Sequence, residues 1–502
     1  MKKQLFLLVL MLLPLAAGAQ DVVEIDGIYY KLYSSFKKAD VTSNPNGYCG
    51  DIVIPSSIIS DGVEYRVTRI GLDAFKDCND LTSVNIPNSV TSIESLAFYR
   101  CNNLTSITIP SSVTDIKYRA FEGCGLTKVE INSNAIVSKV YSHISSIKDV
   151  FGSKVEEYIL GDEVTSIGKW AFAGCYKTTS ITISGNVTSI GVDAFFRCDG
   201  LTSITIPDKV TNIERNPFRE CINLSSIQVE SGNTVYDSRE NCNAIIRTAD
   251  NAMVTGCQNS IIPDGVTSIE DFAFSHFSNL TSIKIPNSVT TIGYYAFEVC
   301  GLTSVNIPNS VTSIGDFAFA SCAHLTSVNI PNRLTALGES VFGGCKALTS
   351  ITIPDNITSI GNSTFYNCIS LKSVIIPGSV TNIGSYAFGK CSSLTDMYCY
   401  AEQVPETGYD AFWDSNCENA TLHVPATSKE AYRNAEQWVN FRKIVALTDS
   451  DPKPTGVTAP TTAAQRPTVV ERYDLSGRRA SKSQRGISIV KTSDGATKFI
   501  SK

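Results

Sequence analysis

The polar and apolar positions of this chain follow a block of 23 residues that recurs through most of its length. Each block reads L-x-x-I-x-I-P, then V-x-x-I-G, then A-F-x-x-C, as in residues 302–322. Isoleucine and valine alternate with threonine and serine, which is the period and the residue choice of β-strands. The proline has no N–H and ends the strand. We therefore predict two short strands per block, on opposite walls, and then a single helical or 3₁₀ turn that buries the phenylalanine.

The copies of this block keep their register along the chain. Eight of the twelve steps between successive first positions are 23 residues long, and two are 22. A repeat of this length is typical of a solenoid, in which each unit buries its apolar side only against its neighbours. Because every copy enters from the same side, we expect stacked copies to pair as parallel strands. The first positions are Leu81, Leu104, Leu126, Val155, Thr178, Leu201, Leu224, Leu280, Leu302, Leu325, Leu348, Leu371 and Leu394.

V-T-S-I-G and A-F-x-x-C recur together at fixed offsets, and this pattern resembles the BspA-like leucine-rich repeats of bacteria over residues 50–445. The resemblance implies a mainly β fold, a leucine-rich-repeat solenoid of stacked parallel strands. It also implies a binding role in adhesion to host or neighbouring-cell surfaces, with extracellular-matrix proteins as the partner type.

Both ends of a solenoid need a cap, because an open end would expose the core and an unpaired strand edge. Short strand patterns without a full repeat predict an N-terminal β cap over residues 20–66. The repeats then occupy residues 67–446, and the last part of this region, residues 396–446, is the expected C-terminal cap.

Within the C-terminal cap, Thr427 and Glu430 have the spacing of a capping box ahead of a helix over residues 428–437. We expect Trp438 and Phe441, which follow this helix, to seal the open end of the core.

Two steps are longer than the repeat, and they predict insertions at residues 132–154 and 231–262. Within the second insertion, residues 244–255 read as a β-hairpin that projects from one face. This hairpin is either a recognition element or a surface loop without a partner. Cys242 and Cys257 flank it and lie opposite each other in the expected pairing, so they form either a disulfide or two packed thiols.

The two ends of the chain have features of an exported protein, so we expect an extracellular or outer-surface location. Residues 1–19 combine two lysines, a short apolar run and small residues, as secretory signal peptides do. Residues 447–468 are rich in proline and threonine and predict a flexible linker. In residues 469–502, Y-D-L-S-G-R and G-I-S-I-V-K resemble the C-terminal sorting domain of type IX secretion cargo; a small β module of another use is the alternative.

Eleven of the sixteen cysteines occupy the last position of the block. Phe277 fills this position in the one unit without cysteine, so we expect it to be apolar and to hold buried free thiols. Stacked neighbours would lie about 5 Å apart, which leaves pairing between coils as the alternative. No histidine or carboxylate recurs in register, which argues against a metal ladder. The eleven residues are Cys78, Cys101, Cys124, Cys175, Cys198, Cys221, Cys300, Cys322, Cys345, Cys368 and Cys391.

The solvent-facing positions of the first strand are the candidate binding positions. The second is mostly threonine and the third mostly serine, which are either a hydroxyl-rich docking surface or ordinary strand residues. The fifth position varies while its surroundings stay fixed, and specificity can reside in such variation on a fixed scaffold. The fifth-position candidates are Asn85, Thr108, Thr182, Thr205, Gln228, Lys284, Asn306, Asn329, Thr352, Ile375 and Tyr398.

Aromatic residues that precede the Ala-Phe pair form a second candidate surface, because aromatic side chains are enriched at interfaces. The alternative is that they only cover the flank of the solenoid. These residues are Trp170, Phe272, Tyr295, Phe317 and Tyr386.

Composition argues against several function classes. The formal net charge is −6 and no basic cluster occurs, so we expect no nucleic-acid partner. The four histidines share no repeat position, and no catalytic, cofactor-binding or metal-binding motif is found, so we do not expect an enzyme. After the signal peptide no apolar stretch is long enough to span a membrane.

We therefore expect a monomeric, non-catalytic module whose solenoid surface binds an extracellular protein or glycan, with a host matrix protein as one such partner. Two alternatives stay open. One is a glycan-binding or nutrient-capture component of the cell surface, and the other is a structural spacer without a specific ligand.

Overall fold

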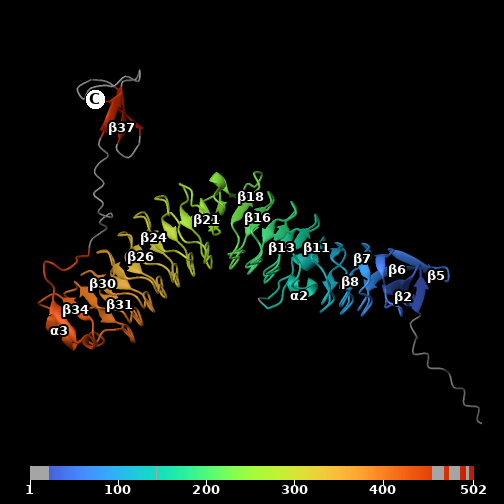
Figure 1. The fold of residues 1–502 in the computed structure, drawn as a ribbon, viewed down its shortest axis with the longest axis horizontal. Coiled ribbons are helices and arrows are strands. Elements are labelled where there is room, and N and C mark those ends of the chain that lie inside the picture. The colour runs from blue at the N-terminus through green and yellow to red at the C-terminus, as the bar shows by residue number, and fades with distance from the viewer. Residues whose placement is uncertain (1–21, 143, 455–468, 474–486, 493–496, 502) are drawn as a thin grey trace, which may run out of the picture. The chain divides into compact units, whose positions relative to one another are not determined.

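The computed structural model describes residues 22–142, 144–454, 469–473, 487–492 and 497–501. The chain divides into two compact units, with the boundary between Pro454 and Thr455. In the first unit, coils stack in chain order and contribute strands to two walls (Figure 1). Within each wall, the strands of neighbouring coils pair in parallel. This confirms the predicted mainly β solenoid of stacked parallel strands.

Two predicted segments lie wholly or largely outside the residues that the structure describes. The signal peptide of residues 1–19 and residues 455–468 of the predicted linker lie outside the described residues.

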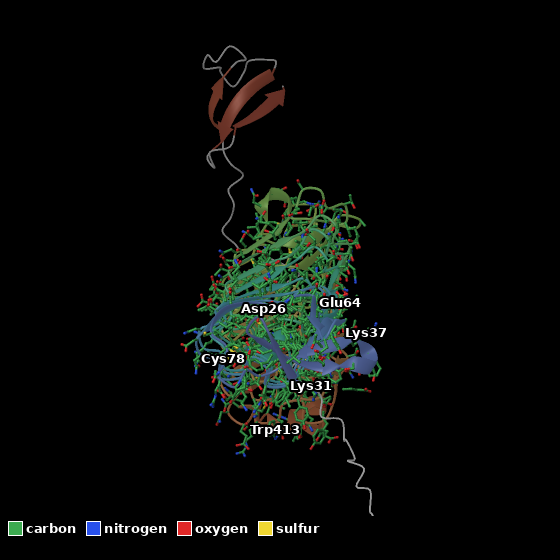
Figure 2. All side chains as sticks on the ribbon, turned by 90° about the vertical axis from the view of Figure 1, so that its right-hand side faces the viewer. Asp26, Lys31, Lys37, Glu64, Cys78 and Trp413 are labelled. Atoms are coloured by element: carbon green, nitrogen blue, oxygen red, sulfur yellow. The ribbon has the colours of Figure 1, made fainter. Side chains whose placement is uncertain are left out.

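The N-terminal end of the solenoid is covered by antiparallel strands that lead into the parallel second wall. β1, β2 and β3 pair in antiparallel order, β6 runs parallel to β3, and β5 pairs antiparallel to β6. The inner side chains of this cap are buried, whereas Figure 2 shows polar side chains such as Lys31, Lys37 and Glu64 at this end. The elements are β1 (Val22–Ile25), β2 (Ile28–Tyr33), the 3₁₀ turn η1 (Ser34–Phe36), β3 (Lys38–Val41), β5 (Ser57–Ser60) and β6 (Val63–Ile70).

The first wall is built from the L-x-x-I-x-I-P part of each coil. Equivalent positions lie side by side, so that Ile351 neighbours Val374 and Val374 neighbours Met397. Its strands are β4 (Gly50–Val53), β7 (Leu81–Asn85), β9 (Ser106–Ile109), β11 (Lys128–Ile131), β12 (Glu157–Leu160), β14 (Ser180–Thr182), β16 (Ser203–Ile206), β18 (Ser226–Val229), β24 (Ser304–Asn306), β26 (Ser327–Asn329), β28 (Ser350–Thr352), β30 (Ser373–Ile376), β32 (Asp396–Cys399), β34 (Thr421–Val424) and β35 (Lys443–Ala446).

The second wall is built from the V-x-x-I-G part, mostly in strands of two residues. The glycine is explained by close approach, because a Cβ on Gly315 would lie 2.5 Å from the backbone nitrogen of Tyr294 in the preceding coil. The strands are β8 (Ser92–Ile93), β10 (Asp115–Ile116), β13 (Ser166–Ile167), β15 (Ser189–Ile190), β17 (Asn212–Ile213), β21 (Ala252–Thr255), β22 (Ser268–Ile269), β23 (Thr291–Ile292), β25 (Ser313–Ile314), β27 (Ala336–Leu337), β29 (Ser359–Ile360), β31 (Asn382–Ile383) and β33 (Glu406–Thr407).

The A-F-x-x-C part forms a third edge, and its backbone differs from the predicted helical or 3₁₀ turn. It is a run of tight turns in which two residues four positions apart have positive φ, such as Phe317 (60°) and Ser321 (58°). This shape lets Phe317, Phe319 and Ser321 donate their N–H groups to carbonyls of the next coil at 2.7–2.9 Å. A helical turn would direct these groups along its own axis, so pairing between coils takes precedence over local helix formation.

Phenylalanine rings stack into a ladder along the core. Within each of the regular stretches, neighbouring rings lie 4.8–5.9 Å apart between centroids and are nearly parallel. This is the separation at which aromatic pairs attract beyond the burial of their area. Among the described residues no ring contact joins Phe218 to Phe274, so the ladder is interrupted across the second long step.

All eleven cysteines at the last position of the block are buried free thiols, as predicted. Nine of them also donate their S–H to the phenylalanine carbonyl of the preceding coil, as Cys101 does to Phe75 at 2.9 Å and Cys345 to Phe319 at 3.3 Å. Desolvation by burial raises the pKa of the Cys322 and Cys368 thiols to about 12. The position is therefore apolar, and in nine coils its side chain also donates a weak hydrogen bond to the preceding coil.

The insertion at residues 132–154 forms part of its coil. The short helix α1 (Asn134–Val137) stands between β10 and β13, where other coils have a second-wall strand. The helix α2 (Ile147–Phe151) begins with a capping box between Ser146 and Asp149. Its Phe151 takes a place in the aromatic ladder, 5.3 Å from Phe121.

The insertion at residues 231–262 contains the predicted hairpin, but the expectation that it projects from one face was wrong. β19 (Tyr236–Asp237), β20 (Ile245–Arg247) and β21 are antiparallel, with the 3₁₀ turn η2 (Arg239–Asn241) between the first two. β21 then pairs in parallel with β22 and serves as the second-wall strand of its coil. Apolar side chains of both hairpin strands are buried, so tertiary pairing makes this segment a variant coil.

Cys242 and Cys257, predicted to form a disulfide or two packed thiols, are both buried and free. Each thiol has a backbone carbonyl within reach: Cys242 Sγ lies 3.7 Å from the Ala244 oxygen and Cys257 Sγ lies 3.2 Å from the Asn243 oxygen. The disulfide is therefore not formed in the structure, which has the packed thiols.

The C-terminal cap closes the core as predicted, but its helix starts differently. α3 (Lys429–Asn434) has Ser428 at its N-cap and no capping hydrogen bond from that side chain, so the predicted Thr427–Glu430 capping box is not formed. Trp438, in the 3₁₀ turn η3 (Trp438–Asn440), is fully buried and donates its indole N–H to the Pro405 carbonyl at 3.1 Å. Phe441 packs edge-on against Phe412.

The second unit contains a small antiparallel sheet. β37 (Ile487–Thr492) is central and pairs with β36 (Val469–Tyr473) and β38 (Thr497–Ser501). This is the β patterning that the sequence predicted for residues 469–502.

Candidate interaction surface

The threonine hydroxyls of the first wall are largely occupied by the solenoid itself. At the second position of the block, Thr326 Oγ1 donates to the Thr303 carbonyl at 2.9 Å and Thr395 Oγ1 to the Lys372 carbonyl at 3.0 Å. These carbonyls lie at the start of each strand and receive a side-chain donor from the next coil. The recurrent threonine therefore has a structural reason, and these hydroxyls are not free donors for a ligand.

The fifth position behaves differently from the second. Six of the eleven predicted side chains are exposed, namely Asn85, Thr108, Thr182, Thr205, Lys284 and Asn306. Only Thr108 among these six has a side-chain hydrogen bond to a described residue, to Glu130 at 3.3 Å. Exposed polar groups without internal partners are available to a ligand, so these positions remain the best candidates on this wall.

The other five predicted residues are less accessible. Gln228, Asn329, Thr352 and Tyr398 are half-buried. Ile375 is only 9% exposed, so the expectation that it faces solvent was wrong. Its strand register places it between Thr352 and Tyr398, and cross-strand neighbours of this kind cover a branched apolar side chain.

The C-terminal end of the first wall is covered by the chain itself. The ring of Tyr398 stacks on His423 at 4.3 Å, and His423 lies 3.8 Å from Asp451. Tyr400 donates its hydroxyl to the Pro452 carbonyl at 2.9 Å. Residues 447–454, predicted as the start of a flexible linker, are therefore held against this wall.

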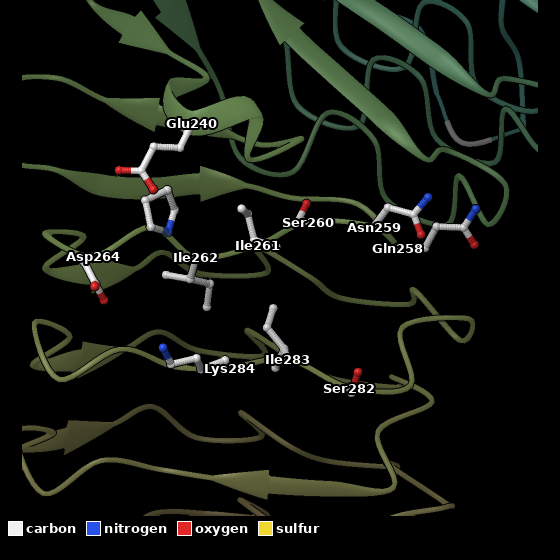
Figure 3. A pocket seen from close by; sticks show the side chains of 11 residues that line it. Glu240, Gln258, Asn259, Ser260, Ile261, Ile262, Asp264, Ser282, Ile283 and Lys284 are labelled. Carbon is white, nitrogen blue, oxygen red and sulfur yellow. The ribbon is translucent and has the colours of Figure 1, made fainter. Parts of the chain in front are cut away.

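Two grooves lie where pairing in the first wall is interrupted. One lies between β7 and β9 and is lined by Asn85, Thr108 and Lys128, together with their neighbours. The other lies between β18 and β24, where two consecutive coils have no first-wall strand, and Lys284 lines it (Figure 3). Three of the predicted residues thus line these two grooves, and Asn306 lines a neighbouring groove together with Lys284, a result that a repeat pattern alone does not contain.

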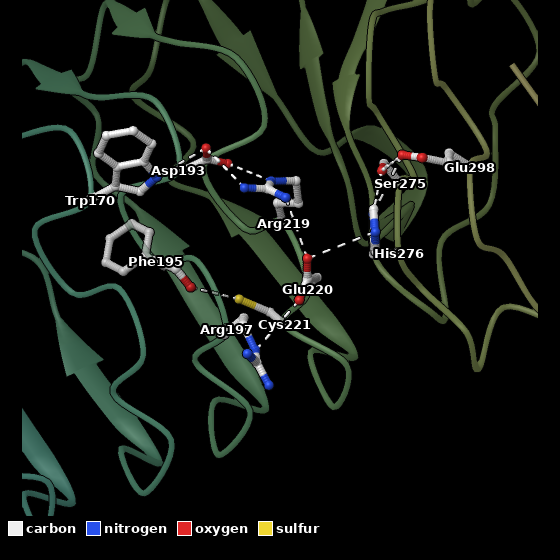
Figure 4. Close-up of polar contacts among 10 residues, drawn as sticks. All are labelled: Trp170, Asp193, Phe195, Arg197, Arg219, Glu220, Cys221, Ser275, His276 and Glu298. Atoms are coloured by element: carbon white, nitrogen blue, oxygen red, sulfur yellow. Dashed lines mark hydrogen bonds and ion pairs between the residues drawn. The ribbon is translucent and has the colours of Figure 1, made fainter. Parts of the chain in front are cut away.

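A polar network on the third edge spans the variant coil, as Figure 4 shows. Trp170 donates to Asp193 at 3.1 Å, and Arg219 bridges Asp193 and Glu220 at 2.9 and 3.3 Å. Glu220 in turn lies 3.8 Å from His276 of the next regular coil.

The far end of this network is Glu298, which lies 3.7 Å from the His276 ring and accepts a hydrogen bond from Ser275 at 3.2 Å. Burial raises the pKa of the Glu298 carboxyl, against the opposing effect of His276. This network could not be predicted from the sequence pattern, because its residues come together only through the stacking of coils. The one signal in the sequence is the long step between Leu224 and Leu280.

The aromatic residues before the Ala-Phe pair form half-buried stacks on the flank. Phe272, Tyr295 and Phe317 stack in sequence at 5.1 and 4.6 Å between centroids. Nearer the C-terminal end, Tyr386 contacts Tyr409 and Trp413, which are 68% and 45% exposed. The predicted residues are thus mostly flank cover, and the accessible rings are neighbours that the repeat pattern did not select.

Comparison with known proteins agrees with this geometry. The model of the BspA-type leucine-rich repeat region matches residues 68–159, 150–249, 252–368 and 312–438. The chain belongs to the BspA-type leucine-rich repeat family. Among curated proteins, none matches the chain.

Two solved structures of leucine-rich repeat proteins are similar to this family member. A leucine-rich cell surface protein from Faecalibacterium prausnitzii is 31% identical, covers 75% of this chain and 94% of its own, and has a TM-score of 0.47. A leucine-rich repeat protein from Eubacterium ventriosum is 23% identical, covers 77% of this chain and 92% of its own, and has a TM-score of 0.52, which shows the same fold.

Two further observations bear on the kind of site. Within the described ranges, no three histidine, cysteine, aspartate or glutamate side chains are grouped so that they could hold a metal ion. The helices of the described part are also too short or too polar to cross a membrane.

Proposed function

We propose that this protein is a non-catalytic interaction module that binds an extracellular protein of a host or neighbouring cell through its first wall. One observation carries the proposal. Among the described residues, the side chains of Asn85, Thr182, Thr205, Lys284 and Asn306 are exposed and have no hydrogen-bond or ion-pair partner. The apolar positions of the block around them are buried, and these five side chains have no bond to another coil within the described residues, so they have no role in holding the coils together.

Family membership supports the same proposal. The relative from Faecalibacterium prausnitzii is described as a cell surface protein, and the similarity covers 94% of that relative and 75% of this chain. We propose the same location here, with residues 1–19 as the export signal and residues 469–502 as a sorting or attachment module of the type IX secretion kind. Removal of residues 469–502 should shift the protein from the cell surface to the medium or the periplasm in a fractionation experiment.

A second candidate function is glycan binding on the flank. Tyr409 and Trp413 are exposed rings beside Tyr386, and Lys390 lies 5.0 Å from the Trp413 ring. Exposed aromatic rings that carry a polar group at one end are suited to partners with one apolar face and one polar face.

The two candidates are separated by one experiment on the full mature chain. It is measured against immobilised collagen, laminin, fibronectin and fibrinogen, and against a glycan array. The protein-binding proposal expects saturable binding to at least one protein of the panel that persists after the panel protein is deglycosylated. Hits confined to the array would favour the glycan function, and binding to neither would contradict both.

A further inference from the structure

The opening of the first wall between β18 and β24 is a feature of that wall alone. The segments 258–263 and 280–285 run beside each other there, and side chains from both line the groove (Figure 3). In the second wall the same coils stay paired, from β21 through β22 to β23. The coils are therefore in contact, yet their first-wall backbones do not form a ladder.

The backbone of Ser282 and Lys284 faces this groove. In paired coils the third and fifth positions of the block face the preceding coil; the fifth-position carbonyl of Ile375, for example, accepts from the Ile353 N–H of the coil before it at 3.0 Å. Ser282 and Lys284 occupy the third and fifth positions. Within the part of the chain that the structure describes, neither their N–H nor their C=O groups have a hydrogen-bond partner. This is an unpaired backbone edge at first-wall positions of the solenoid.

The segment on the other side of the groove offers no strand that could pair with this edge. Residues 257–263 lack the L-x-x-I-x-I pattern. The Cys257 N–H donates to Ser260 Oγ at 2.7 Å, which turns the chain, and Pro263 has no N–H to offer. This coil therefore presents no strand with which Ser282 and Lys284 could pair.

The side chains around the groove add apolar and charged features to this edge. Ile261 is 53% exposed and Ile283 is half-buried. Figure 3 shows Glu240, Asp264 and Lys284 near one end of the groove. None of these three charged groups forms an ion pair with another described residue, and the two carboxylates outnumber the one ammonium group.

We infer that this groove binds an extended peptide segment of a partner protein, which adds as a strand to the edge of Ser282 and Lys284. The peptide backbone supplies the donors and acceptors that this edge lacks, which is the mode of β-strand addition. Alternate side chains of the peptide contact Ile261 and Ile283, and a basic residue lies beside Glu240 and Asp264. The inference rests on the proposed function and narrows its partner class to proteins with an exposed extended segment.

The test selects peptides from a random phage-displayed library on the full mature chain and measures the affinity of the synthetic peptides. Lys284→Pro removes one edge N–H, whereas the matched variant Lys284→Ala keeps it. Because that N–H has no internal partner, both variants should keep the wild-type melting temperature. We expect Lys284→Pro to weaken peptide binding by about tenfold and Lys284→Ala to change it by less than about threefold.

A second measurement leaves the protein unchanged. N-methylation of alternate backbone amides in a selected peptide should abolish binding in one of the two alternations and spare it in the other, because only one edge of the added strand faces the wall. Equal sensitivity of both alternations, equal affinity of Lys284→Pro and Lys284→Ala, or no peptide enriched over a scrambled library would each overturn the inference.

Failure of this inference and failure of the proposed function give different results. A chain that binds a matrix protein with the same affinity after Lys284→Pro keeps the proposed function and loses the groove as its contact. A chain that binds selected peptides with the expected pattern but no protein of the panel keeps the groove and loses the proposed partner class.

Discussion

The cysteine at the end of each block shows how one residue type serves two purposes at once. Because Phe277 occupies the same position, the sequence was enough to predict an apolar, buried site. The sequence could not show that the thiol also donates to a phenylalanine carbonyl, since that partner lies 25 or 26 residues away and is placed only by coil stacking. This bond explains why cysteine recurs where alanine or valine would also fit.

The number of cysteines that react with iodoacetamide can be predicted from their burial. All sixteen cysteines are free, and only Cys49 is exposed. Burial also raises the pKa of the Cys242 thiol to about 11, which keeps this thiol protonated at pH 8. Brief iodoacetamide treatment at pH 8 should therefore modify one cysteine in the native protein and sixteen in guanidinium without a reductant, counted by intact mass spectrometry.

The count in guanidinium separates the alternatives for Cys242 and Cys257. Fourteen modified cysteines, rising to sixteen after reduction, would show one disulfide, and peptide mapping that places it at Cys242 and Cys257 would contradict the packed thiols of the structure.

At the scale of elements, repetition decided what could be predicted. Strands inside the block were predictable, because each copy restates the same alternation and the proline that ends it. The third edge was not, since its turns are fixed by hydrogen bonds from Phe317, Phe319 and Ser321 to the next coil and not by local helix propensity. The hairpin of residues 244–255 was found from its local pattern, but its partner β22 lies outside that pattern, so its burial was missed.

The integration of this hairpin is tested by stability. Met253 is fully buried in β21, and its replacement by alanine should lower the free energy of unfolding by about 2–5 kcal/mol. Glu240→Ala, an exposed side chain in the same insertion, is the matched control and should change it by less than about 0.5 kcal/mol. The measurement is denaturant unfolding followed by circular dichroism. Equally small changes in the free energy of unfolding for the two variants would indicate that the hairpin projects as a loop.

At the scale of the whole molecule, the solenoid separates support from recognition. The phenylalanine ladder, the thiol bonds and the threonine hydroxyl bonds hold neighbouring coils together, and all of them repeat. The exposed varied side chains of the first wall contribute to none of these contacts, whereas the half-buried Asn329 side chain bonds to the Ile307 backbone of the preceding coil at 2.7 and 2.9 Å. Of the candidate surface, the sequence could therefore predict which positions vary, while the grooves and the cover over Tyr398 depend on where stacking is interrupted and where residues 447–454 return to the wall.

Matched arginine variants on the two walls test the proposal that the first wall is the binding face. Thr205→Arg with Asn306→Arg alters exposed positions of the first wall, and Asn212→Arg with Ser313→Arg alters exposed positions of the second wall in the same two coils. Both pairs add the same charge and replace side chains that have no hydrogen-bond partner among the described residues, so both should keep the wild-type melting temperature.

The measurement is the affinity of each double variant for the immobilised matrix protein that the unaltered chain binds, determined by biolayer interferometry. We expect a loss of about tenfold or more for the first-wall pair and a change of less than about threefold for the second-wall pair. Equal affinities for the two pairs, or the larger loss in the second-wall pair, would contradict it.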